Sequence, residues 1–215
     1  LFSGGAILAA IFIRLNIRHA MKTHPIQPNA FRLVSGELVI DPQRVAGLLG
    51  LLSWALTLLP ALIFGLVASS LWLDVLSFVE RVPFGTTDPV FGKDVSFYVF
   101  ELPMLTSGRS IAMGIVVISM LVSGVYYLFH QSTMGTTPEP LSVRARKHLF
   151  LLAGVLFLLI GFGWWLDRFD LLFSRSGAVW GVGYTDEHAR LPAFTAMTVI
   201  SIGAGIAMFS SIRDG

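Results

Sequence analysis

The sequence predicts an all-α protein: a polytopic transmembrane helix bundle with one interfacial amphipathic helix and structured extracytoplasmic loops. Hydrophobic residues make up 54% of the 215 residues and charged residues only 13%, against roughly 25% charged in an ordinary soluble domain. The charges also gather in a few places, which leaves four long windows without any. A helix of about 20 apolar residues crosses a hydrocarbon core of roughly 30 Å. Four such windows favour membrane spans over the buried core helices of a soluble protein.

We expect five membrane segments in a single transmembrane domain that covers residues 1–215. The first is incomplete, at about 1–13, and the others lie at about 45–67, 110–129, 149–166 and 191–212. Only 13 residues precede Arg14, which is too short for a span, and the basic flank of a signal peptide is absent. We therefore expect the chain to be a fragment of a longer protein.

The second segment is longer than one span requires, because residues 45–73 contain no charge. Pro60 lies inside it and removes the backbone hydrogen bond to Leu56, so a kink is expected there. In a bundle, neighbouring helices or the Thr57 hydroxyl can compensate for the lost bond.

Small and hydroxyl-bearing residues within the spans predict contacts between helices. Small residues let helices approach closely; they are Gly47 and Gly50, Gly161 and Gly163, and Ser201 with Gly205. We expect the hydroxyl groups to form hydrogen bonds between helices rather than to line a substrate path. The residues concerned are Ser53, Thr57, Ser119, Ser123, Thr195, Thr198 and Ser201.

Residues 70–82 follow with the pattern of an amphipathic helix. Ser70, Asp74, Ser77 and Arg81 share one face, and Leu71, Val75, Phe78, Val79 and Val82 share the other, with Trp72 beside them. Such a helix lies in the membrane interface. An extension of the second helix beyond the membrane explains the same pattern, and both interpretations stay open at this point.

The distribution of Lys and Arg predicts the orientation of the chain. Loop 14–44 carries five basic and two acidic residues, and loop 130–148 carries three basic residues and one acidic. Segments 74–109 and 167–190 contain more acidic than basic residues. Because cytoplasmic loops are enriched in Lys and Arg, we expect loops 14–44 and 130–148 in the cytoplasm and loops 70–109 and 167–190 outside it.

Residues 88–103 form an aromatic-rich polar segment between two apolar ones. Pro83, Gly85, Pro89 and Gly92 break regular structure before and within it. Residues 95–100 favour a strand but are apolar on both faces, so we expect a short element that packs against the bundle. The segment therefore predicts a fixed plug of turns and aromatic rings, within outer loop 83–109, rather than a catalytic site.

The residues contain no pattern typical of a catalytic, cofactor or metal site. There is no cysteine, and the five histidines lack the spacing of a zinc helix. Asp88 and Asp94 lack the alternating acidic pattern of a calcium loop, and residues 85–93 lack phosphate-loop spacing. The complete spans contain no charge, which argues against a proton- or sodium-coupled transporter. No basic face with interleaved aromatics predicts nucleic-acid binding, and the basic residues 144–147 predict at most attraction to anionic lipid.

Several motifs together resemble a family of large bacterial membrane proteins of unassigned function, an uncharacterised (UPF-type) family. The long motif is Asp88-Pro-x-Phe-Gly-x-Asp-x-x-Phe-Tyr-x-Phe-x-Leu-Pro103, followed by Arg146-Lys-His-Leu149, Trp165-Leu-Asp-Arg-Phe169 and Gly181-x-Gly-Tyr-Thr-Asp186. The resemblance implies a bacterial inner-membrane protein with a large extracytoplasmic domain after its membrane region. This chain would then lack the first helix, the last helix and that domain.

Our first hypothesis is a scaffold or assembly subunit that anchors an extracytoplasmic domain or a partner complex. Its partners would be membrane lipids and other membrane protein subunits. The expected docking residues are Asp88, Phe91, Asp94, Phe97, Tyr98, Phe100, Trp165, Asp167, Arg168, Tyr184, Asp186 and His188. A transporter or lipid-handling protein with a polar mid-depth cavity is the alternative. A lipid-modifying enzyme comes third and requires Asp88, Asp94, Asp186 and His188 to converge.

Overall fold

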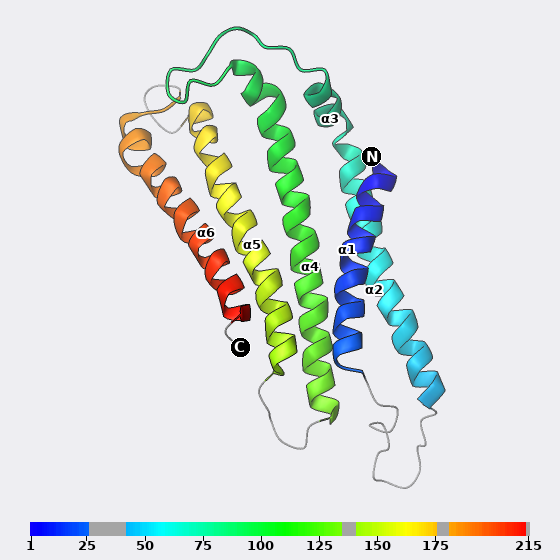
Figure 1. Cartoon of the computed structure of the whole chain (residues 1–215). Helices are drawn as coiled ribbons and strands as arrows, with labels where there is room; N and C mark the ends of the chain where they lie inside the picture. Colours follow the sequence, from blue (N-terminus) through cyan, green and yellow to red (C-terminus); the bar gives the residue numbers. More distant parts are fainter. Residues whose placement is uncertain (26–41, 135–140, 176–180, 214–215) are drawn as a thin grey trace.

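The chain folds into a bundle of long helices that lie side by side (Figure 1). The computed structural model describes residues 1–25, 42–134, 141–175 and 181–213. Its long helices are α1 (Phe2–Thr23), α2 (Pro42–Ser70), α4 (Leu102–Met134), α5 (Val143–Asp170) and α6 (Leu191–Arg213). The described residues form no strand, and the predicted all-α class is confirmed.

Four segments of the described chain have the length and composition of membrane spans. They are Gly47–Ser70, Phe97–Gln131, Val143–Phe173 and Asp186–Arg213. Each overlaps one of the four charge-free windows of the sequence. The predicted transmembrane bundle therefore has the helices that it requires.

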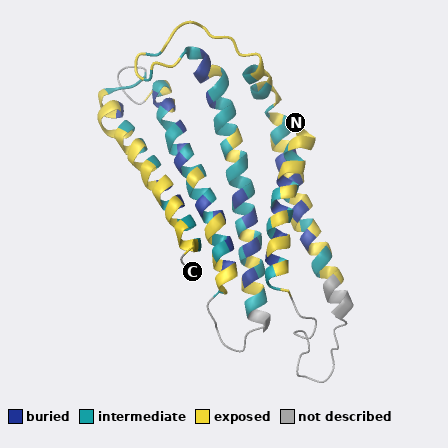
Figure 2. Cartoon of the chain, viewed as in Figure 1, coloured by how far each residue is buried: buried dark blue, intermediate teal, exposed yellow. Residues whose placement is uncertain are grey.

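The helices pack in the order α2, α1, α4, α5, α6 across the bundle (Figure 1). Apolar side chains cover much of the outside, and exposed residues are most frequent along α6 and the outer face of α2 (Figure 2). Leu8 and Leu51, for example, are each 69% exposed. Large contiguous apolar surfaces are rare on soluble monomers, so this surface suits contact with lipid or with other helices.

Close approaches at glycine fix the two outer helix pairs. A Cβ atom added at Gly5 of α1 would lie 2.5 Å from the Cβ of Ala68 in α2. One added at Gly205 of α6 would lie 3.0 Å from the Gly154 carbonyl oxygen of α5. Ser201 and Gly205 are both buried, so the small-residue face expected on the last span is a packing face.

The span hydroxyl groups bond mainly to their own helices, contrary to expectation. Thr57 donates to Ser53, Thr195 to Leu191 and Thr198 to Phe194, each to a backbone carbonyl four residues earlier. Because the Thr57 hydroxyl donates to Ser53, it does not compensate for the hydrogen bond that Pro60 removes at the Leu56 carbonyl. Even so, α2 continues through Pro60 as one helix. These three hydroxyls therefore satisfy themselves locally, whereas Ser53 also accepts a hydrogen bond from Arg14 of α1.

The first helix extends ten residues past its expected end near Ile13, to Thr23. The charges from Arg14 onward predict a loop, but the helix continues through them. Arg14, Arg18 and Lys22 recur every fourth residue, however, so one helical stripe carries all three. The charges therefore indicate where the apolar layer ends, not where the helix ends. Residues 26–41 of the expected loop lie outside the described part of the chain.

The amphipathic segment forms a separate short helix, α3 (Trp72–Val79), after a turn at Leu71. Its most exposed side chains are apolar: Trp72, Leu73, Leu76 and Val79 are all more than half exposed. Asp74 and Ser77 are half-buried. Leu71, Val75 and Phe78 of the predicted apolar face are half-buried as well, while Ser70 and Arg81 of the predicted polar face are exposed. Burial therefore does not separate the two predicted faces.

We expect Gly205→Leu to destabilise the bundle by about 1–3 kcal/mol, because the larger side chain must enter the filled space between α5 and α6. Gly203→Leu is the matched control, since a Cβ at Gly203 meets nothing within 4 Å. Thermal unfolding in detergent measures both variants. Equal unfolding temperatures would show that α6 does not pack on α5 through this face.

Candidate functional site

The motif segment folds over one end of the bundle, and we call this region the motif cap. It comprises loop 83–96, the π-helical turn η2 (Phe97–Glu101) and residues 162–173 at the end of α5 with the 3₁₀ turn η3 (Leu171–Phe173). In Figure 1 the loop passes above α4 and reaches the end of α5. The strand-prone residues 95–100 are helical, and most of them lie in the π turn, which packs on the bundle as expected of a short element.

Asp88 closes the loop through its carboxylate. Oδ1 accepts the backbone N–H groups of Val90 at 2.9 Å and Phe91 at 2.6 Å. Oδ2 accepts the N–H of Lys93 at 2.8 Å and the Tyr98 hydroxyl at 2.7 Å. An Asp side chain that bonds the backbone a few residues later is a turn-forming device, and here the same carboxylate also ties the loop to η2.

Asp94 makes a second closure. Its carboxylate accepts the N–H groups of Phe84, Gly85 and Ser96 at 3.1, 2.9 and 2.8 Å. Gly85 and Gly92 have φ angles of +71° and +65°, which glycine adopts without strain. The two glycines and two carboxylates together determine the path of the loop.

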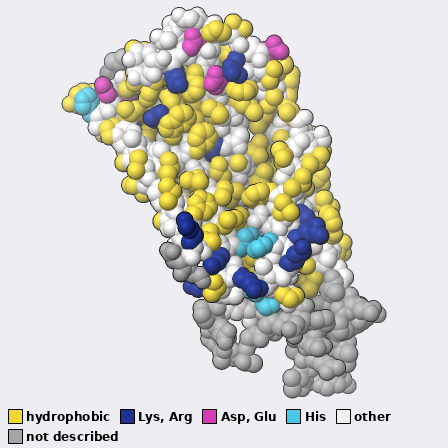
Figure 3. Space-filling view, in the orientation of Figure 1, with side chains coloured by type: hydrophobic (Ala, Val, Ile, Leu, Met, Phe, Trp, Pro, Cys, Tyr) yellow, Lys and Arg dark blue, Asp and Glu magenta, His cyan; other side chains and the backbone are white. Residues whose placement is uncertain are grey.

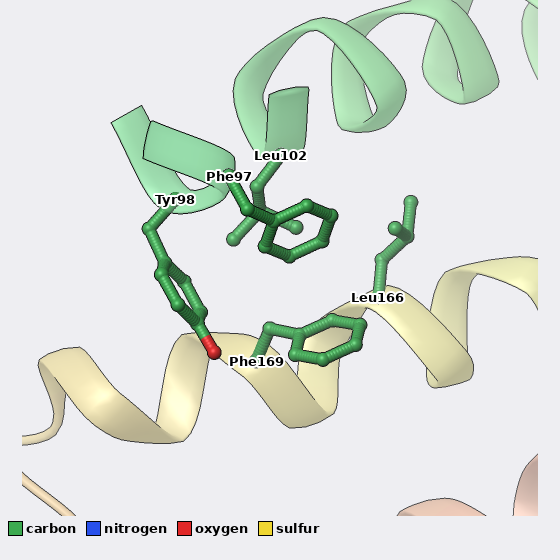
Figure 4. Packing of buried hydrophobic residues seen from close by; sticks show 5 residues of the cluster. All are labelled: Phe97, Tyr98, Leu102, Leu166 and Phe169. Atoms are coloured by element: carbon green, nitrogen blue, oxygen red, sulfur yellow. The ribbon is translucent and has the colours of Figure 1, made fainter. Parts of the chain in front are cut away.

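Aromatic packing holds the loop on α5. Phe97, Tyr98 and Leu102 meet Leu166 and Phe169 in a buried cluster (Figure 4). The Phe169 ring lies 4.9 Å from that of Phe91 and 5.0 Å from that of Phe97, in edge-to-face arrangements. Such pairs contribute about 0.5–1.5 kcal/mol each beyond their buried area.

The hydrogen bonds keep both loop carboxylates ionised. Burial alone would raise the pKa of Asp88, but the bonds from Phe91, Tyr98, Lys93 and Val90 outweigh it and lower the pKa below its usual value. Bonds from the Ser96 side chain and N–H, with those from Phe84 and Gly85, lower the pKa of Asp94 to about 2. The ionised form is the one that accepts these bonds.

Residues 181–190 form the second structured region at this end. Asp186 is buried, and its carboxylate accepts the Gly183 N–H at 3.1 Å and pairs with Arg190 at 3.0 Å. Tyr184 is 78% exposed and stacks on His188 with ring centroids 4.0 Å apart. This stacked pair is the exposed aromatic feature of the region.

The structure divides the twelve expected docking residues into three groups. Phe97, Tyr98 and Asp186 are buried, and only Tyr184 and His188 are exposed. The others are half-buried: Asp88, Phe91, Asp94, Phe100, Trp165, Asp167 and Arg168. Among these, Phe100 packs on Phe84 at 5.7 Å, and the Arg168 guanidinium lies 4.9 Å from the centroids of the Trp165 and Phe169 rings. Most of the twelve expected docking residues are therefore part of the folded structure at this end. Tyr184 and His188 are the two that are exposed to a partner.

The carboxylates on which an enzyme would depend are engaged within their own loops. Asp88, Asp94 and Asp186 accept hydrogen bonds from backbone N–H groups, from the Tyr98 hydroxyl or from Arg190. Within the described residues, no three His, Asp or Glu side chains are arranged to hold a metal ion. The geometry supports a structural role for all three.

Sequence reasoning missed a cluster of histidines at the opposite end of the bundle. We call this end of the bundle the basic end. His148 of α5 lies 2.7 Å from the Tyr127 hydroxyl and 2.8 Å from the Asn16 amide oxygen. Its ring is 4.6 Å from that of His19, and the His24 ring is 5.3 Å from that of His130. Four of the five histidines thus meet from three helices. Their sequence spacing gave no signal, because the cluster depends on which helices are neighbours.

A charged residue inside a helix of membrane length was also missed. Arg109 lies in the second turn of α4, within the span Phe97–Gln131. Its Nε donates to the Leu159 carbonyl of α5 at 3.1 Å, and its guanidinium occupies the space that a side chain at Gly163 would fill. Charges inside spans are costly and usually paired; here the helix is longer than the expected span, and Arg109 joins it to α5.

The whole chain matches one protein family. The model of "Uncharacterised protein family (UPF0182)" covers residues 1–214. The chain belongs to this family. It is 32% identical to a UPF0182 protein of Geobacter sp. (strain M21) over 97% of the chain and 23% of that protein. It is 36% identical to one of Mycobacterium bovis (strain BCG / Pasteur 1173P2) over 75% of the chain and 17% of the relative.

The UPF0182 chain therefore spans less than a quarter of the length of these curated relatives. A third relative, from Desulfitobacterium hafniense (strain Y51), is 41% identical over 64% of the chain and 16% of its own length. No solved structure matches the chain. The family predicted by resemblance is confirmed.

We expect Asp88→Asn to destabilise the motif cap by about 1–2 kcal/mol, because an amide replaces a charged acceptor of four hydrogen bonds. Tyr98→Phe removes one of these bonds but keeps the ring, so its effect should be smaller. Limited proteolysis of loop 83–96 reports on the cap. Equal cleavage of wild type and Asp88→Asn would show that this carboxylate does not hold the loop.

The cap should also loosen in acid. Because the folded pKa values of Asp88 and Asp94 lie below 3.8, their contribution is complete above about pH 4 and is lost as the pH falls toward 2. Amide hydrogen exchange, corrected for its intrinsic pH dependence, should show falling protection at Phe91, Lys93 and Ser96. Amides of central α5 serve as the control, and constant protection of the loop down to pH 2 would contradict the assignment.

Proposed function

We propose that this region of the UPF0182 protein is a membrane scaffold that positions an extracytoplasmic domain or a partner complex. One observation carries the proposal: the polar groups of the motif satisfy one another, and its aromatic rings hold the loop on α5, so together they build a fixed platform. Asp88 and Asp94 together accept seven hydrogen bonds, all from residues 84–98. A platform of this kind orients what binds to it.

The exposed part of the platform is suited to protein contact. Tyr184 and His188 present a stacked aromatic pair, and Phe84 and Val90 of the loop are 53% and 43% exposed. Aromatic residues are enriched where binding energy is concentrated in interfaces. We infer that other membrane protein subunits, or the remainder of the full-length protein, contact this surface.

The transporter hypothesis receives less support. It requires a polar cavity at mid-depth, whereas the cavity found between α1, α2 and α4 has mainly aliphatic and aromatic walls. Its serine residues, Ser53 and Ser123, are exceptions in an apolar lining. We therefore retain the scaffold as the proposed function.

We further propose the orientation that the charge pattern predicts, in the bacterial inner membrane. The described carboxylates all lie at the motif-cap end, beside several basic residues, whereas the charged residues described at the basic end are lysines and arginines, with histidines among them (Figure 3). The basic end is therefore assigned to the cytoplasm.

Cysteine labelling tests the orientation, since the chain contains no cysteine of its own. A cysteine replacing Lys93 of the motif loop should react with a membrane-impermeant maleimide added to intact cells without an outer-membrane barrier. One replacing Lys147 should react only after lysis. The reverse pattern would invert the orientation.

Docking is tested by the double variant Tyr184→Ala/His188→Ala in the full-length protein. It should reduce recovery of associated subunits, or detach the extracytoplasmic domain from the cap in cross-linking, because it removes exposed rings without disturbing the buried cluster. Thr185→Ala, an exposed change in the same segment, is the control. Association that survives the double variant would mean that this surface does not dock a partner.

A further inference from the structure

A cavity of about 210 Å³ lies between α1, α2 and α4, in the half of the bundle nearer the basic end. Ile17 and Met21 line it from α1, and Tyr126 and Phe129 line it from α4. Leu52 and Val125 also line it and are more than half exposed. The cavity therefore opens sideways, between helices whose surroundings are lipid, and its walls suit a hydrocarbon chain.

A buried hydroxyl group in the cavity wall has no hydrogen-bond partner within the described chain. Ser123 is fully buried and lines the cavity, yet its Oγ finds no hydrogen-bond partner among the described residues. Serine in a helix ordinarily bonds a carbonyl of the preceding turn, as Ser53 does with Gly50 at 2.7 Å. A buried polar group without a partner costs free energy, so this hydroxyl is available to a bound molecule.

Basic residues continue from the wall of the cavity toward the end of α1. The Arg14 guanidinium donates to Ser53 Oγ, another wall residue, at 3.0 Å and lies 4.0 Å above the Trp54 ring. Arg18 and Lys22 follow at four-residue spacing and are exposed. Ile17 and Met21 of the cavity wall lie beside this stripe, so apolar wall and cationic stripe are adjacent on one helix.

Nothing acidic in the described structure opposes these cations. Every described carboxylate belongs to α3 or the residue after it, the motif cap or the segment before α6, at the opposite end of the bundle (Figure 3). Basic residues at the membrane surface attract anionic headgroups, each strengthening binding by about fivefold. The charge therefore specifies an anionic rather than a zwitterionic lipid.

From these contacts the structure assigns a binding site for one anionic phospholipid at the basic end. One acyl chain lies in the cavity beside Phe129, its ester carbonyl accepts a hydrogen bond from the Ser123 hydroxyl, and the phosphate lies on the stripe of Arg14, Arg18 and Lys22. Each buried methylene contributes to affinity, and the cations select the headgroup. The site lies away from the motif cap, so it goes beyond the scaffold function and stands or falls separately from it.

The test uses full-length protein in nanodiscs that contain equal amounts of phosphatidylglycerol and phosphatidylcholine. Native mass spectrometry after release should find phosphatidylglycerol retained in preference to phosphatidylcholine. Ser123→Leu fills the cavity and should lose the retained lipid while keeping or raising the unfolding temperature. Val125→Trp blocks the opening of the cavity from an exposed position and should also lose the retained lipid. This variant keeps the test valid if Ser123→Leu does not fold.

Two further variants separate the chain-binding and headgroup-binding parts of the site. Arg18→Gln/Lys22→Gln should lower the ratio of phosphatidylglycerol to phosphatidylcholine by more than tenfold. Leu121→Phe, on an exposed face of α4, should retain lipid like the wild type. Unchanged retention in both cavity variants, or a cross-link from the cavity to another helix of the full-length protein, would overturn the proposal.

Discussion

The cost of placing charge in hydrocarbon is the constraint on which the rest of this structure depends. An Asp, Lys or Arg at the centre of a membrane helix costs about 2.5–3.5 kcal/mol in insertion measurements. Within the described chain the charged side chains lie toward the two ends of the bundle, and the carboxylates all lie at one of them. The two ends then differ in chemistry: one forms hydrogen-bonded loops, and the other forms a histidine cluster beside a basic helix stripe.

At the acidic end, the ionised side chains serve the fold. Asp88 and Asp94 would be natural candidates for a metal or a catalytic acid if only their sequence were considered. Their oxygens instead close the loop, and Phe91, Phe97 and Tyr98 fasten the closed loop to Phe169. A segment with so many internal bonds acts as a rigid platform, which is why the scaffold proposal follows from its geometry.

The sequence was sufficient for the fold class and the spans, because absence of charge over 18 or more residues has few explanations. It was less informative about helix ends: Arg14 and Arg109 both lie within helices that continue past the apolar layer. The compact motif loop was foreseeable from Asp and Gly turn chemistry. The histidine cluster and the apolar cavity were not, since both require knowing that α1 packs beside α4, which no local pattern encodes.

A density map of the full-length protein in a lipid bilayer tests the central claim most directly. Our account predicts the motif loop closed as here, with Asp88 bonded to Phe91, Lys93 and Tyr98, and with further protein density over Tyr184 and His188. A loop that is open, with a small molecule or metal bound between Asp88 and Asp94, would contradict it, because those carboxylates would then serve a ligand and not the platform.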